Sequence, residues 1–296
     1  MLITHIKLLL TAIFWGGTFI AGRIVAQNVP PFSAAFLRFL IATVILLAVT
    51  WRMEPRFPRL TARQACVIVL LGMTGVFFYN FFFFLGLKNI DAGRASLIIA
   101  LNPVMICAGA AIFFRENITP LKILGIIVSV SGALVVISRG NLLHIFQGGI
   151  GMGELYIFGC VLSWVSFSLI GKLILGALSP LVSITYSSLA GMLALLIPAS
   201  MEGMWGQLAG YRVIDWTGLL YLGFCGTVLG FVWYYEGIQK IGSTRAGLYI
   251  NFVPVSAVIM AWLMLNEPVT LSLLVGAGMV STGVYMTSLK QEPTGS

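Results

Sequence analysis

The sequence contains very few charged residues. Of its 296 residues only 9% are Asp, Glu, Lys or Arg, whereas 59% are hydrophobic and the mean hydropathy is +1.02. A soluble domain has about 25% charged residues, so this chain lacks the polar surface that a protein needs in water. The composition excludes a soluble globular protein and predicts a polytopic integral membrane protein.

Residues suited to catalysis or metal binding are also scarce. The chain has two histidines and two aspartates, and its four cysteines stand singly in apolar runs. No CxxC, HExxH or GxSxG motif is present, so neither a metal site nor a catalytic nucleophile is indicated. The net charge is +8, but no basic cluster indicates nucleic acid binding. We therefore expect no cofactor, no metal and no catalytic residues.

Long apolar runs account for most of the chain. A helix needs about 20 apolar residues to cross a bilayer, and backbone groups in lipid must form internal hydrogen bonds. The sequence therefore predicts an all-α integral membrane protein. The ten expected transmembrane helices are residues 5–25, 32–51, 64–86, 92–114, 121–138, 153–173, 180–200, 214–236, 244–265 and 270–289.

The distribution of Lys and Arg predicts the orientation. With both termini on one side, that side receives eleven of these residues and the other side five, while Arg38 falls inside the second segment. Cytoplasmic loops carry the excess of positive charge. Both termini are therefore expected in the cytoplasm.

An internal repeat divides the chain into two halves. When the sequence is shifted by 151 positions, thirteen of the 47 residues in 86–132 are identical, and a shift of 149 superimposes Trp15 on Trp164. Hydrophobicity alone does not explain matched Trp, Pro and Glu residues. We expect five helices in each half, and because five is odd the two repeats have inverted topology. The predicted division is a first repeat at 1–140, a connecting loop at 141–152, a second repeat at 153–290 and a tail at 291–296.

Inverted repeats are typical of secondary transporters, whose substrate site lies between the halves near broken helices. In the fourth segment Asn102 precedes Pro103, and in the ninth Tyr249 and Asn251 precede Pro254. We expect Asn102, Tyr249 and Asn251 to bind substrate and both prolines to act as hinges. Alternatively, the asparagines only bridge neighbouring helices.

Trp15 and Trp164 are expected near the middle of their helices, where an indole N–H needs a partner or a cavity. We predict that both tryptophans bind substrate. Gly16 and Gly17 follow Trp15 and serve either as a hinge or as close-packing positions.

The stretch 75–87 contains seven aromatic residues and Asn80. Asn80 is unfavourable in lipid, and helical spacing places Phe77 and Phe83 on its side. These three residues, with Tyr234 of the equivalent eighth segment, are predicted to line the site. The outermost rings are expected to form a membrane belt.

Arg38 is the one cation expected away from an interface. Three interpretations remain open: its side chain extends to the membrane surface, it binds a backbone carbonyl, or it contacts a carboxylate of the substrate.

The chain resembles the drug/metabolite transporter superfamily and, more narrowly, its EamA-type family. The similar residues in the first helix of each half are Phe14-Trp-Gly-Gly-Thr-Phe19 and Ser163-Trp164. Each half also has a proline followed about a dozen residues later by a similar segment. In the first half Pro103 precedes Arg115-Glu-Asn-Ile-Thr119, and in the second Pro254 precedes Asn266-Glu-Pro-Val-Thr270. The first of these segments lacks the proline expected after its glutamate. The resemblance covers nearly the whole chain and implies a carrier of the bacterial inner membrane, often an exporter of amino acids or related metabolites, with a central cavity.

The sequence thus predicts a secondary transporter that exports aromatic or apolar amino acids by alternating access, with a small molecule and the lipid bilayer as its partners. The alternatives are a carrier of other metabolites or drugs, a channel, or, least favoured, a membrane-embedded enzyme. The oligomeric state does not follow from the sequence.

Overall fold

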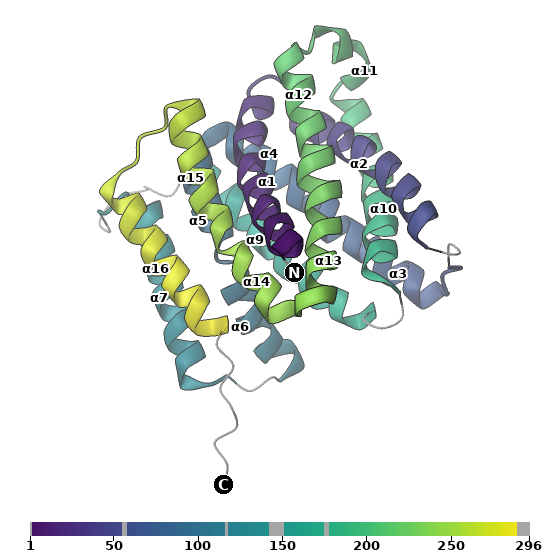
Figure 1. Cartoon of the computed structure of the whole chain (residues 1–296). Helices are drawn as coiled ribbons and strands as arrows, with labels where there is room; N and C mark the ends of the chain where they lie inside the picture. The colour runs from purple at the N-terminus through teal and green to yellow at the C-terminus, as the bar shows by residue number, and fades with distance from the viewer. Residues whose placement is uncertain (1, 55–57, 116–117, 142–150, 175–177, 289–296) are drawn as a thin grey trace.

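The computed structural model describes residues 2–54, 58–115, 118–141, 151–174 and 178–288, which form helices joined by short loops (Figure 1). Within these residues there is no β-strand, and ten helical segments are long and apolar enough to cross a membrane. The predicted all-α architecture is confirmed, and each segment begins and ends within five residues of its predicted position.

Six of the ten segments are continuous helices and four are interrupted. The continuous helices are α1 (Leu2–Ala26), α2 (Pro31–Met53), α7 (Pro120–Ile137), α9 (Met152–Gly171), α10 (Pro180–Met201) and α16 (Leu271–Ser288). The interrupted segments are α3–η1–α4 (Ala62–Leu71, Gly72–Phe78, Tyr79–Asn89), α5–α6 (Ala92–Ile99, Asn102–Phe114), α12–η4–α13 (Val213–Tyr221, Leu222–Leu229, Gly230–Ile241) and α14–α15 (Ser243–Ile250, Phe252–Leu265). Short helices η2 (Lys172–Ile174), α11 (Met204–Gln207) and η3 (Leu208–Gly210) lie in the connections.

The interruptions recur at equivalent places in the two halves. Both η1 and η4 are π-helical, and a shift of 151 superimposes them almost residue for residue. The same shift places the break at Ala100 on the break at Asn251, and it places Arg115 on Asn266, both of which have a left-handed backbone. The duplication therefore extends to the backbone. The predicted connecting loop falls mostly on 142–150, outside the described residues.

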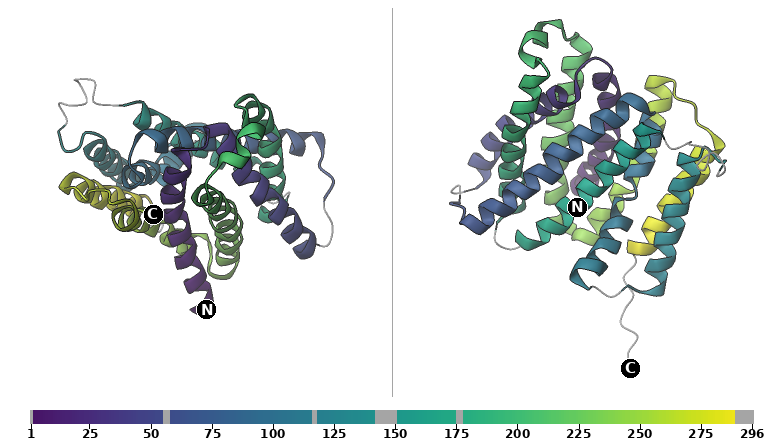
Figure 2. Two further views of the ribbon diagram at one scale, coloured as in Figure 1. Left: turned by 90° about the horizontal axis from the view of Figure 1, so that it is seen from above. Right: turned by 180° about the vertical axis from the view of Figure 1, so that it is seen from behind.

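The first helix of each half packs against the third segment of the other half. Gly237 of α13 faces Leu8 of α1, and a Cβ on Gly237 would lie 2.5 Å from that leucine. At the equivalent place, a Cβ on Gly86 of α4 would lie 2.4 Å from Ile157 of α9. Helices α1 and α9 thus cross the centre of the molecule and join its two halves (Figures 1 and 2).

Helices α7 and α16 form an antiparallel pair at one edge of the molecule (Figure 2). Small residues bring their backbones together: a Cβ on Gly276 would lie 2.8 Å from the carbonyl oxygen of Gly132, and one on Gly125 would lie 2.7 Å from that of Gly283. The hydroxyl of Ser129 donates to the carbonyl of Val280 at 3.0 Å. Such close contact of small residues is the usual basis of helix association in a bilayer.

Carboxylates that follow one helix cap the start of another. Glu202, after α10, accepts hydrogen bonds from the backbone N–H groups of Phe32 and Ser33 at the start of α2. Glu54, after α2, accepts one from the hydroxyl of Ser179 at the start of α10. Glu267 accepts two from the N–H groups of Ala92 and Gly93 in α5. Because a helix N-terminus has unpaired N–H groups and a partial positive charge, these contacts stabilise the junctions between the halves.

We predict that Gly276→Leu destabilises the protein, because the new side chain overlaps Val136 and the backbone of Gly132. Overpacking of this kind costs about 1–3 kcal/mol. The measurement is the midpoint of thermal unfolding in detergent. Gly278→Leu in the same helix is the control, because a Cβ there meets nothing within 4 Å. Equal midpoints for the two variants would contradict close packing of α7 and α16.

Glu202→Ala is expected to lower the free energy of unfolding by about 1–2 kcal/mol, through loss of the capped N–H groups of α2 and of the charge at the helix terminus. Glu202→Gln retains a hydrogen-bond acceptor and should lose less. Urea or thermal unfolding of the purified variants gives the order. An Ala variant as stable as the wild type would show that the cap contributes nothing.

Candidate functional site

Trp15 lies in the middle of α1 and finds a partner in the π-helical segment η4. Its indole Nε1 donates to the carbonyl of Gly226 at 2.9 Å. A π-helical turn changes the regular pairing of backbone carbonyls, so Gly226 can accept this bond. Gly230 provides room for the ring, since a Cβ there would lie 2.4 Å from the same Nε1. The expectation that this indole needs a partner is confirmed.

Five aromatic residues, Trp15, Tyr79, Trp164, Phe231 and Tyr234, form a continuous group that we name the aromatic cluster. Phe231 lies between the two tryptophans, with ring centroids 5.7 Å from Trp15 and 6.3 Å from Trp164. Tyr79 contacts Trp164 at 5.5 Å and Tyr234 contacts Trp15 at 5.3 Å. All five are half-buried. Tryptophans from equivalent positions of the two halves therefore meet in one ring-rich region.

Arg38 of α2 lies in the interior of the molecule. Its side chain is buried, and Nη1 donates to Oδ1 of Asn80 at 2.8 Å. Nε and Nη2 lie 3.4 and 3.3 Å from Oγ1 of Thr227. No carboxylate of the described residues forms an ion pair with it. The interpretation that Arg38 extends to the membrane surface is therefore wrong, because its guanidinium points toward neutral groups of η4 and α4.

Asn80 and Thr227 are held with their oxygens toward Arg38. The amide of Asn80 donates to the carbonyl of Val76 at 2.8 Å, and the hydroxyl of Thr227 donates to the carbonyl of Leu222 at 3.0 Å. Both side chains are about 1% exposed. The prediction that Asn80 avoids lipid is confirmed, and its role in the structure is to bind Arg38.

Phe83 connects the arginine with the aromatic cluster. Its ring lies 5.9 Å from Cζ of Arg38 on one side and 5.9 Å from the ring of Tyr79 on another. A second connection runs through η4, where Thr227, which binds Arg38, directly follows Gly226, which binds Trp15. Along each of these two connections, a short link joins the guanidinium to the aromatic cluster.

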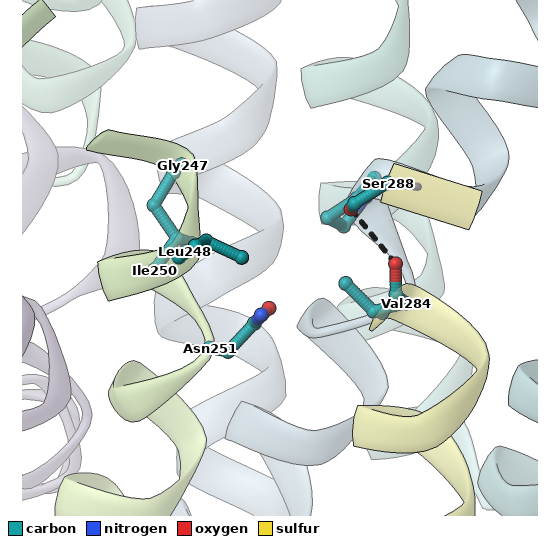
Figure 3. A pocket seen from close by; sticks show the side chains of 7 residues that line it. Gly247, Leu248, Ile250, Asn251, Val284 and Ser288 are labelled. Atoms are coloured by element: carbon teal, nitrogen blue, oxygen red, sulfur yellow. Dashed lines mark hydrogen bonds between the residues drawn. The ribbon is translucent and has the colours of Figure 1, made fainter. Parts of the chain in front are cut away.

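The two helix breaks that the prolines predict lie side by side. A cavity of about 250 Å³ is lined by Pro103 of α6 and Asn251 between α14 and α15. Figure 3 shows the amide of Asn251 pointing into it, toward Val284 and Ser288 of α16. Oδ1 of Asn102 is buried and has no hydrogen-bond partner among the described residues. Residues of both breaks thus line one cavity, and no member of the aromatic cluster lines it.

Other predicted residues lie elsewhere. The hydroxyl of Tyr249 pairs with Nδ1 of His5 at 2.6 Å, and Phe77 packs against Phe32. Their assignment to the substrate site stays a prediction. Helix α1 continues through Gly16 and Gly17, where a Cβ would lie 2.1 Å from Ser256 and 2.2 Å from Tyr221 respectively. These distances support the close-packing interpretation of both glycines.

Polar contacts join the two halves at opposite ends of the molecule. Where α5 and α9 begin, Arg94 and Glu154 form a buried ion pair of 2.9 Å beside a polar cavity of about 470 Å³. Where α1 begins, His5 binds Tyr249, and Lys7 pairs with Glu236 of α13 at 2.7 Å. Each set joins a first helix to a segment of the other half.

Sequence reasoning did not assign Tyr79, Phe231 or Thr227 to the site. The two aromatic residues lie in ring-rich runs that are visible in the sequence, but the run does not show which ring faces inward. Thr227 is a single hydroxyl in an apolar helix and has no recognisable signal.

Comparison with known proteins agrees with the duplicated architecture. The model of the EamA-like transporter family matches the chain twice, at residues 2–138 and 151–289. The "Uncharacterized transporter YyaM" of Bacillus subtilis is 29% identical over 284 residues, which cover 96% of this chain and 93% of that protein. The "Probable terminal-alkyne amino-acid exporter" of Streptantibioticus cattleyicolor is 29% identical, with coverage of 94% and 91%.

A solved structure titled "Crystal structure of protein" superimposes with a TM-score of 0.65 at 18% identity, covering 96% of each chain, and supports the fold alone. Two matches to one family model, one in each half, cover almost all of the sequence. This chain therefore belongs to the EamA-like transporter family.

Proposed function

We propose that the protein is a secondary transporter that exports aromatic or apolar amino acids across the bacterial inner membrane. The observation that supports this most is the aromatic cluster, in which Trp15 and Trp164 of the two halves approach each other through Phe231. Half-buried rings at an interface between repeats suit an apolar or aromatic side chain. The name of the Streptantibioticus cattleyicolor relative agrees with an amino-acid substrate.

The scarcity of buried cations argues against phosphate esters or nucleotide sugars. Arg38 and Arg94 are the buried cations of the described residues, and Arg94 is already paired with Glu154. A phosphate group is usually bound by several Lys and Arg donors. A single available guanidinium better suits a substrate with one negative charge.

Transport would proceed by alternating access. The end where α1 begins is cytoplasmic if the excess of Lys and Arg marks the inner side. The contacts of His5 and Lys7 then close the cytoplasmic end, and the Arg94–Glu154 pair closes the external end. When the contacts at one end separate while those at the other end remain, the aromatic cluster is exposed to one side of the membrane at a time. The helix interruptions before Pro103 and Pro254 serve as hinges for this movement.

Counterflow in proteoliposomes tests the proposed function. Vesicles loaded with unlabelled phenylalanine should take up labelled phenylalanine in a saturable manner. Trp164→Ala is expected to weaken apparent affinity about tenfold, equivalent to ~1.4 kcal/mol of lost ring contact. The control is Trp262→Ala, because Trp262 of α15 is 55% exposed on the surface and lies outside the cluster.

Uptake that does not depend on internal substrate would indicate a channel. The absence of phenylalanine counterflow by correctly folded protein would contradict the proposed substrate. Equal losses in the two tryptophan variants would contradict the assignment of the site to the cluster.

Glu154→Gln is expected to open the external end, because it leaves Arg94 buried without its counter-ion, a loss that costs about 3–5 kcal/mol in buried pairs. A cysteine placed at Ser138, which lines the adjacent polar cavity, should then react several-fold faster with a membrane-impermeant thiol reagent. Glu236→Gln, at the opposite end, is the control and should not accelerate this labelling. Unchanged labelling in Glu154→Gln would rule out a closing role for the pair.

A further inference from the structure

The inference concerns how the substrate is oriented, and it rests on the proposed function. Arg38 differs from the other buried cation of the described residues. Arg94 has Glu154 at 2.9 Å, whereas Arg38 has only the neutral oxygens of Asn80 and Thr227. A buried charge without a counter-ion is strongly unfavourable, so its retention requires a reason.

The contacts of Arg38 leave part of its binding capacity unused. A guanidinium has five N–H donors, and its hydrogen bonds account for three of them. Two of the three converge on one hydroxyl oxygen, at 3.4 and 3.3 Å, which is long for a bond from a charged donor. A carboxylate would replace this shared contact with a bidentate, charge-matched pair.

The residues that hold Arg38 are tied to the π-helical parts of the third and eighth segments. Asn80 is bonded to the carbonyl of Val76 in η1, and Thr227 is part of η4. π-Helical turns are often sites where a helix rearranges. A shift of either segment relative to α2 would withdraw a neutral oxygen from Arg38 and free its N–H donors for another acceptor.

The two halves differ at this place, although Trp15 and Trp164 occupy equivalent positions. The position equivalent to Arg38 in the second half is Ser187, and the position equivalent to Asn80 is Phe231. The pair of Arg38 and Asn80 is therefore present in the first half only, and the ring that separates the tryptophans takes the place of the asparagine in the second half. Such a site has one charged end and one apolar end.

We propose that Arg38 binds the carboxylate of the substrate while the aromatic cluster holds its side chain, so that the transporter selects aromatic monocarboxylates, with or without an amino group. No acidic side chain of the described residues is hydrogen-bonded to the cluster; Glu236, the acid of α13, is paired with Lys7 and Lys240 at the helix end. The substrate's ammonium group therefore has no counter-ion there. The carboxylate is the recognised group.

Competition in the phenylalanine counterflow assay shows whether the transporter recognises the carboxylate or the ammonium group of the substrate. 3-Phenylpropionate has the ring and the carboxylate but no amine, and phenethylamine has the ring and the amine but no carboxylate. We expect 3-phenylpropionate to inhibit with an apparent affinity within about threefold of phenylalanine's own. Phenethylamine should be at least tenfold weaker.

Two variants test Arg38 directly. Arg38→Gln should raise the KM for phenylalanine at least tenfold and abolish the preference for phenylpropionate over phenethylamine. Asn80→Asp places a carboxylate where the amide now lies, 2.8 Å from the guanidinium, and so supplies an internal counter-ion. It should keep or raise the thermal midpoint while reducing counterflow at least tenfold. Size-exclusion chromatography and the thermal midpoint in detergent establish that each variant is folded.

The outcomes distinguish the two levels of the proposal. If the wild type exchanges phenylalanine but phenethylamine competes as well as phenylpropionate, the carboxylate assignment is overturned and the proposed function stands. Wild-type transport by folded Asn80→Asp has the same meaning, because an arginine that only stabilises the fold tolerates an added carboxylate. If the wild type exchanges none of these compounds, the proposed function fails, and the inference fails with it.

Discussion

The packing of α1 and α9 across the centre of the molecule is the constraint on which the rest of the structure depends. Each of these helices belongs to one half of the chain and packs on the third segment of the other, through glycines at equivalent places. This exchange brings Trp15 and Trp164 to the two sides of Phe231. It also means that neither half encloses the aromatic cluster alone, so any movement between the halves changes the site.

The π-helical segments connect this packing with the buried polar groups. Irregular backbone at membrane depth is tolerated only where protein groups satisfy the released hydrogen bonds. In η4 the carbonyl of Gly226 accepts from Trp15 and that of Leu222 from Thr227, while in η1 the carbonyl of Val76 accepts from Asn80. The side chains of Asn80 and Thr227 also orient Arg38. The hydrogen bonds that satisfy the π-helical backbone and those that hold the guanidinium of Arg38 therefore belong to one network.

Much of the architecture follows from local properties of the sequence. Apolar length located all ten helices, because the bilayer sets the length of a spanning helix. The internal repeat located the paired breaks, since Pro103 and Pro254 remove a helical hydrogen bond wherever they occur. The demand of a mid-membrane indole for a partner was also foreseeable for Trp15. Among the proposed site residues, Asn80 was expected to avoid lipid for the same kind of reason, namely the cost of an unsatisfied amide.

Contacts between distant segments were not foreseeable in this way. The direction of Arg38 depends on Asn80 and Thr227, which lie 42 and 189 residues away along the chain, and an isolated arginine in an apolar helix can equally extend to the surface. Likewise Phe77 and Phe83 occupy the same run of rings, yet one packs on Phe32 and the other beside Arg38. The sequence by itself determined the number, length and duplication of the helices, because these depend on hydrophobicity and backbone chemistry along the chain. Only the tertiary structure decided which side chains share an interior, because that depends on how helices from the two halves pack together.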